Sequence, residues 1–139
     1  MTKTQSRRIW AEAMDAARAA ARTRLAELQA QGPAWAAVQH ENPLDDNSPI
    51  ESVVGTMLDI CGFAWLQFRQ CNRKPTCTLI RNLKAQGVRI SRDSYQGGYY
   101  ASVPGLGRQE LSVNLASAQA AAKVLQDHGV NVYAQSRVD

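Results

Sequence analysis

The chain of 139 residues has no apolar run of the roughly 18 residues that a membrane-spanning helix needs. Its first 25 residues carry charges where a secretory signal peptide has its apolar centre. Cysteine is scarce as well, with three residues in the chain. An odd number does not make a closed disulfide framework, and the spacings do not match a zinc knuckle. We therefore expect a cytoplasmic protein with reduced thiols, no metal and no cofactor.

Signatures of catalysis are also missing. The glycine-rich residues 104–107 lack the Gly-Lys-Ser/Thr ending of a phosphate-binding loop, and no G-x-G-x-x-G fingerprint occurs. Cys61 or Cys77 would need His128 as a base, but no local pattern joins them. His128 is better explained as a cation at the end of a helix, next to Gly129. The sequence predicts a protein that is not an enzyme.

Lysine and arginine are absent from residues 32–60, a stretch that carries five acidic side chains. Residues 1–31 hold six basic and three acidic side chains, and residues 61–93 hold seven basic side chains against Asp93 alone. The net charge of +4 is therefore unevenly distributed. The acidic stretch either pairs with the basic segments inside the fold or leaves a basic patch exposed for an acidic partner.

The periodicity of apolar residues predicts a single α+β domain over residues 1–139. An Ala-rich helix within residues 1–31 ends at Gly32-Pro33, and an acidic loop follows over residues 32–59, with a helical turn from Ser48 through Asp59 as an option. Residues 60–139 read as β-α-β-β-α-β, the ferredoxin-like split arrangement with an antiparallel sheet. The elements expected there are strands at 60–68, 88–94, 99–103 and 130–136 and helices at 74–87 and 110–128.

Strand alternation predicts that Tyr100, Tyr133 and Arg89 lie on the sheet face away from the helices of this core. Either Phe63 and Trp65 or Leu66 and Phe68 would join them, because the first strand is apolar on both faces. We expect the N-terminal helix or residues 32–50 to cover this face, since large exposed aromatic patches are unusual. The alternative is an open face that stacks bases, as in RNA-recognition-motif domains. The QGGYYASV strand departs from the signature of those domains.

Four short motifs carry a resemblance: HENPLDDNSP (40–49), CGFAW (61–65), SYQGGYY (94–100) and SRVD (136–139). Together they resemble a family of small accessory proteins encoded by bacteriophages and mobile elements. The sequence departs from the family pattern at Arg108-Gln109-Glu110, where Gln-Ser is usual. The resemblance supplies no catalytic residue. It implies a protein that acts by binding inside the host bacterial cell.

The first prediction is accordingly a phage-type accessory protein that inhibits a host defence complex, in the manner of anti-CRISPR proteins, by binding a host protein or ribonucleoprotein. The alternatives are a nucleic-acid-binding module that uses the open sheet face and the basic segment 69–92, and a protein that binds or sequesters a nucleotide. The predicted partner-binding residues are Tyr95, Tyr99, Tyr100, Tyr133, Arg69, Arg73, Lys74, Arg81, Lys84, Arg89 and Arg92. A polar site is predicted from Asp45, Asp46, Asn47, Ser48, Gly97, Gly98, Ser136, Arg137 and Asp139.

Overall fold

The computed structural model of the chain describes residues 1–69 and 74–139, residue 54 by its backbone alone. Within this part the chain is α+β, with a long N-terminal helix and two antiparallel sheets. The helices are α1 (Lys3–Gln31), α2 (Thr76–Ala85) and α3 (Leu111–Asp127). The strands are β1 (Trp35–His40), β2 (Ile50–Met57), β3 (Gly62–Phe68), β4 (Ser91–Arg92), β5 (Tyr99–Ser102) and β6 (Val132–Val138).

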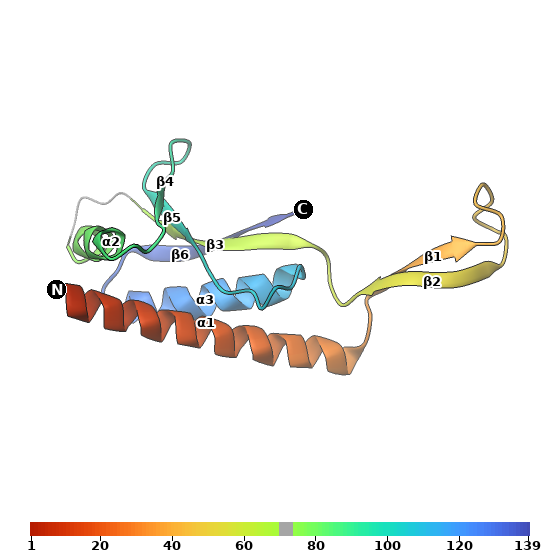
Figure 1. The fold of residues 1–139 in the computed structure, drawn as a ribbon, viewed down its shortest axis with the longest axis horizontal. Coiled ribbons are helices and arrows are strands. Elements are labelled where there is room, and N and C mark those ends of the chain that lie inside the picture. Colours follow the sequence, from red (N-terminus) through yellow and green to blue (C-terminus); the bar gives the residue numbers. More distant parts are fainter. Residues whose placement is uncertain (70–73) are drawn as a thin grey trace.

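The larger sheet has four strands in the order β4-β5-β3-β6, and each neighbouring pair is antiparallel. Helix α3 packs against β3 and β6, α1 packs along α3, and α2 lies at one end of the sheet (Figure 1). The N-terminal helix therefore joins the helical side of the sheet. No described helix covers the other face, and only the turn between β4 and β5 lies over part of it. The expectation that α1 or residues 32–50 cover that face was wrong.

Alternation sorts the strand residues between the two faces. Leu66 and Phe68 of β3 are fully buried against the helices, together with Ala101 of β5 and Val132 of β6. Each of these side chains excludes water from a continuous apolar core, which is the main stabilising term in folding.

The packing of α1 on α3 depends on small side chains. Ala13, Ala17 and Ala21 recur every four residues along α1 and are fully buried, so they form one stripe that lets another helix approach closely. On α3, Ala121 and Ala122 are buried in the same core as Ala13 and Ala17. The Ala-rich composition of both helices is thus explained by their contact.

The segment predicted as an acidic loop is instead a hairpin, in which β1 and β2 pair antiparallel and project from the body as an arm, residues 35–57 (Figure 1). The predicted helical turn from Ser48 is replaced by strand β2. Pro33, Pro43 and Pro49 had argued against regular structure, but all of them lie outside the two strands. Proline is tolerated at such positions because no ladder hydrogen bond is lost there.

From residue 60 onward, each expected helix and strand is present with shifted ends. The expected strand at 88–94 shortens to the two residues of β4, while the last strand begins at Val132 and extends to Val138. None of the helices in the described ranges is both long and apolar enough to cross a membrane.

Candidate binding face

The uncovered face of the larger sheet, which we call the open face, gathers aromatic side chains from neighbouring strands. In the register of the sheet Trp65 lies opposite Ser102, Gln67 lies opposite Tyr100, and Phe63 lies opposite Arg137. Phe63 is 49% exposed and Tyr100 is 41% exposed. Phe63, Trp65, Tyr100 and Arg137 line an open hollow of about 450 Å³. Of the alternatives left by the sequence, the pair Phe63 and Trp65 is therefore the one on this face.

A chain of hydrogen bonds fixes the centre of the open face. Trp65 Nε1 donates to Gln67 Oε1 over 3.0 Å, and Gln67 Nε2 donates to Asp93 Oδ2 over 3.1 Å. Gln67 is only 2% exposed although it lies on the open face, since these partners and the Gly97 carbonyl surround its amide. Gln67 was missed by the sequence analysis. Its signal was a polar residue inside the otherwise apolar strand GFAWLQF.

Asp93 shapes the turn beside this chain. Its Oδ1 accepts hydrogen bonds from the backbone N–H groups of Gln96 (3.0 Å) and Tyr95 (2.9 Å). These bonds, that from Gln96 foremost, lower the pKa of the Asp93 carboxyl below its ordinary value, with the Gln67 amide adding to the effect. The carboxylate thus holds the β4–β5 turn, and Asp93 also lines the hollow beside Phe63 and Trp65.

Three arginines supply positive charge to the open face. The Arg137 guanidinium lies 5.6 Å from the centre of the Phe63 ring, and the Arg69 guanidinium lies 4.7 Å from the centre of the Tyr133 ring. Such cation–π contacts hold a planar guanidinium against an aromatic surface. Arg89 lines a second hollow of about 230 Å³, which shares Tyr100 and Ser102 with the first.

The other predicted partner-binding residues lie elsewhere. Tyr99 faces the helical side, where it packs on the core, and the centre of its ring lies 5.2 Å from Lys84 Nζ. Arg92 pairs with Tyr99 in the register and shares its face. Tyr95 is 97% exposed in the β4–β5 turn. Three more predicted cations stand apart from the open face: Arg81 and Lys84 on α2, and Lys74 just before it. Arg73 lies outside the described residues.

The predicted polar site is divided among three places. Asp45, Asp46, Asn47 and Ser48 form the tip of the arm, whereas the Gly97-Gly98 turn lies at the opposite end of the molecule (Figure 1). The third group, Ser136, Arg137 and Asp139, lies at the end of β6. The arm tip lies apart from the other two groups, so the structure does not bring all three together. Arg137 and Asp93, whose backbone pairs with Gly97 and Gly98, line one hollow.

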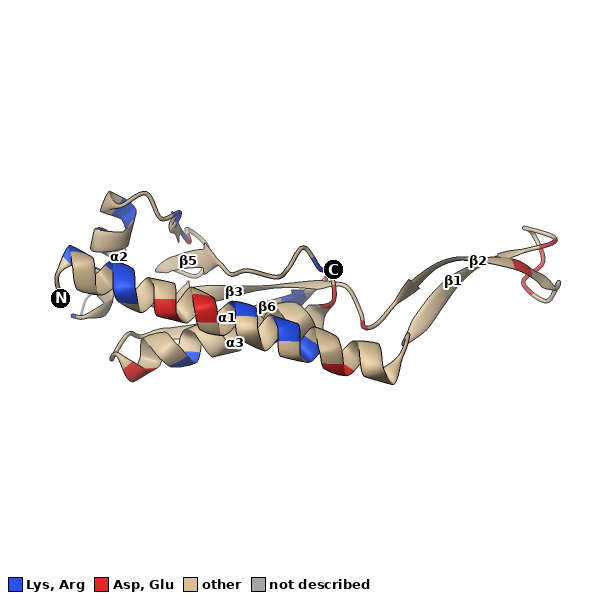
Figure 2. Cartoon of the chain, turned by 60° about the horizontal axis from the view of Figure 1, so that its bottom comes forward, with Lys and Arg blue, Asp and Glu red and all other residues tan. Residues whose placement is uncertain are grey.

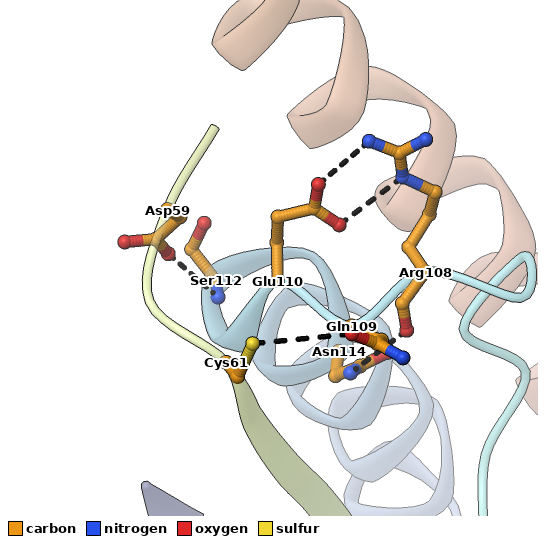
Figure 3. A network of polar contacts seen from close by, with 7 residues as sticks. All are labelled: Asp59, Cys61, Arg108, Gln109, Glu110, Ser112 and Asn114. Carbon is orange, nitrogen blue, oxygen red and sulfur yellow. Dashed lines mark hydrogen bonds and ion pairs between the residues drawn. The ribbon is translucent and has the colours of Figure 1, made fainter. Parts of the chain in front are cut away.

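A polar network joins the root of the arm to the start of α3 (Figure 3). Asp59 Oδ2 accepts a hydrogen bond from the Ser112 N–H over 3.0 Å. It thus caps the N-terminus of α3 although Asp59 is distant from that helix in the sequence. Burial raises the pKa of Asp59, but hydrogen bonds from Ser112 and the Ile60 backbone outweigh burial and leave that pKa below its ordinary value.

In the same network, the Arg108 guanidinium donates two hydrogen bonds, of 2.6 and 3.1 Å, to the buried Glu110 carboxylate. Burial raises the pKa of Glu110, and the bonds and positive charge of Arg108 outweigh that effect, so the net shift is downward. Asn114 Nδ2 donates to the Gly62 carbonyl, which ties β3 to α3. The network ties the segment after the arm to the start of α3.

Cys61 and His128 flank opposite ends of α3, which has 17 residues and is therefore about 25 Å long. Cys61 Sγ lies 4.0 Å from Gln109 Oε1, and His128 Nε2 lies 3.5 Å from Glu12 Oε2 on α1. They do not form a nucleophile–base pair. Within residues 1–69 and 74–139, no group of three or more His, Cys, Asp and Glu side chains is placed to hold a metal ion.

Comparisons with known proteins add nothing to this geometry. The sequence matches no protein-family model, and it has no match among curated proteins or solved structures. The likeness to phage-type accessory proteins stays a prediction.

Proposed function

We propose that the protein acts by binding, without catalysis, and that its open face takes single-stranded nucleic acid. The observation that carries the proposal is the uncovered face on which Phe63, Trp65 and Tyr100 lie beside arginines. Aromatic rings exposed on a sheet stack unpaired bases, and arginines on the same surface pair with phosphates. A double helix would not offer its base planes to such a face.

We also propose that residues 62–138 form the ferredoxin-like split arrangement. The order β4-β5-β3-β6, with antiparallel neighbours, supports this, as does the succession β-α-β-β-α-β along the chain. In this arrangement both helices of the repeat pack on one face, which leaves the other face available to a ligand.

The test is the affinity for fluorescent oligo(U) and oligo(dT), measured by anisotropy over a range of salt concentrations. Tyr100→Ala removes one stacking platform and should weaken binding by about 5- to 150-fold, the equivalent of about 1–3 kcal/mol. Tyr95→Ala is the matched control, because that side chain is 97% exposed in the turn, outside the hollow. Arg137→Ala should reduce the steepness of the salt dependence by about one phosphate contact.

Equal affinities for the wild type and Tyr100→Ala would refute base stacking on this face. Affinity that does not fall with salt would refute the role of the arginines. Circular dichroism of each variant shows whether the fold is retained.

The second candidate is the inhibitor of a host defence complex that the sequence resemblance predicts. The observation that favours it is Tyr95, which an ordered turn holds almost fully exposed. Tyrosine is enriched among the residues that dominate protein interfaces. This candidate reverses the roles of the two variants, since Tyr95→Ala would abolish capture of a stoichiometric host protein while Tyr100→Ala would not.

A further inference from the structure

The tip of the arm, residues 41–49, is a turn held by hydrogen bonds among its own residues. Ser48 Oγ donates to the Asp45 carbonyl over 2.7 Å, and the Asn47 N–H donates to Asp45 Oδ1 over 3.0 Å. His40 Nδ1 donates to the Ser48 carbonyl over 2.9 Å, which locks the tip onto the end of β1. The LDDNSP motif therefore builds a hydrogen-bonded turn.

This turn presents a leucine to solvent. Leu44 is 96% exposed, and its backbone N–H is held by Asn42 Oδ1. The strands behind it expose further apolar side chains, since Trp35 is 46%, Ile50 59% and Val53 59% exposed. A hairpin of two strands is marginally stable in water unless it packs on another surface. The arm therefore has the composition of a surface that is covered by a partner.

The root of the arm directs it away from its own body. Leu58 packs with Leu25, Leu28 and Val113, and the Ala34 N–H donates to the Met57 carbonyl at the base of the hairpin. Figure 1 shows the tip at the far end of the molecule from the β4–β5 turn. In this structure the tip lies away from the open face of its own chain, so a partner of the tip would be a different molecule.

Charge indicates which molecule. The arm carries Glu41, Asp45, Asp46 and Glu51 and no basic residue, whereas all 16 Lys and Arg residues lie outside it (Figure 2). The remainder of the chain holds those 16 basic residues against eight acidic ones. A second copy of this chain thus offers a surface of opposite charge. Within that copy, the open face has three arginines, Arg69, Arg89 and Arg137, against one carboxylate in the aromatic hollow, that of Asp93. Its excess of positive charge matches a leucine flanked by carboxylates.

We propose that the arm of one copy docks on the open face of a second copy, with Leu44 inserted in the hollow lined by Phe63, Trp65 and Tyr100. Carboxylates of the tip then lie toward Arg137 and Arg89. The docked arm and single-stranded nucleic acid occupy the same face, so each displaces the other. Self-association of the protein alone tests the docking, whether or not nucleic acid binds.

Sedimentation velocity over a series of protein concentrations is the decisive measurement. We expect the wild type to self-associate, more strongly at low salt than at high salt because opposite charges meet in the interface. Leu44→Ser should weaken the association by about tenfold or more, since it removes one buried leucine from the interface. Leu106→Ser is the matched control, as Leu106 is exposed in the turn after β5, outside both the arm and the lining of the hollow.

A complementation experiment then locates the docking surface. Phe63→Ala removes part of the hollow but leaves the tip intact, while Leu44→Ser does the reverse. Each variant alone should be largely monomeric, and an equimolar mixture should recover association through the one intact contact. A monomeric wild type would overturn the proposal, and so would a Leu44→Ser variant that associates like the wild type. Failure of the mixture to recover, or an inert Phe63→Ala, would overturn the assignment to the open face.

Discussion

Replacing Gly98 by alanine is the sharpest test of how the β4–β5 turn meets the sheet. Gly98 has a φ of +75°, and a Cβ built there would lie 2.0 Å from the carbonyl oxygen of Phe68. Alanine in the left-handed region costs about 1–2 kcal/mol. The clash involves the backbone of a buried strand, so relief requires a backbone shift that costs about 1–3 kcal/mol more. The sum is a loss of about 2–5 kcal/mol of unfolding free energy.

Gly97→Ala is the matched control, because Gly97 has a φ of +80° but nothing within 4 Å of a built Cβ. It should lose only the conformational term of about 1–2 kcal/mol. Urea unfolding followed by tryptophan fluorescence gives both values, and thermal melts should show a fall of about 3 °C per kcal/mol for a chain of this size. Equal losses in the two variants would refute the argument that Gly98 is required by close approach to Phe68.

The root network yields two further predictions. Asp59 and Glu110 have pKa values below their ordinary ones in the folded protein, so the folded state favours their ionised forms. Their stabilisation of the fold is complete at pH values above the ordinary carboxyl pKa, and it should be lost as the pH falls from about 5 through the lowered pKa values. Urea unfolding at several pH values measures this. A free energy of unfolding that stays constant or rises on acidification would contradict it. Arg108→Gln should lower the free energy of unfolding by about 1–3 kcal/mol, because it leaves the buried Glu110 carboxylate without its guanidinium. Adding Glu110→Gln to this variant should reduce that loss. An unreduced loss in the double variant would show that the pair is not responsible.

The part of the fold after residue 60 could be read from local signals. Gly87, Gly97 and Gly129 interrupt the apolar periodicity, and all three adopt positive φ where an element ends or turns. Alternation within the strands sorted Tyr99 from Tyr100 correctly, because a period of two leaves little freedom once one face is buried. The short β4 was overestimated, since the alternating sequence around it continues beyond the two residues that pair.

The arm could not be read in the same way. Its alternation is weak because neither face is buried in the chain, so no periodic signal marks β1 or β2. Prolines and the acidic cluster at the tip are turn features, and they dominated the sequence pattern. Placement of α1 also lay beyond the sequence, because a stripe of alanines fits a helix as well as a sheet. The buried alanines of α3 decided it.

The open face and the arm both expose apolar side chains, and they carry charge of opposite sign. The face exposes aromatic rings with an excess of arginine, while the arm exposes leucine, isoleucine and valine with carboxylates and no cation. Charges of one sign that were merely solvated would not need apolar side chains beside them, and a patch held only for solubility would not be built on a hydrogen-bonded turn such as that of Asp45 and Ser48. An acidic, apolar arm also resembles a nucleic acid strand chemically, since both bring negative charge to arginine and flat or apolar groups to aromatic rings. On the two proposals above, the open face accepts either the arm or a nucleic acid strand, and the concentration of the protein should decide which of the two it holds.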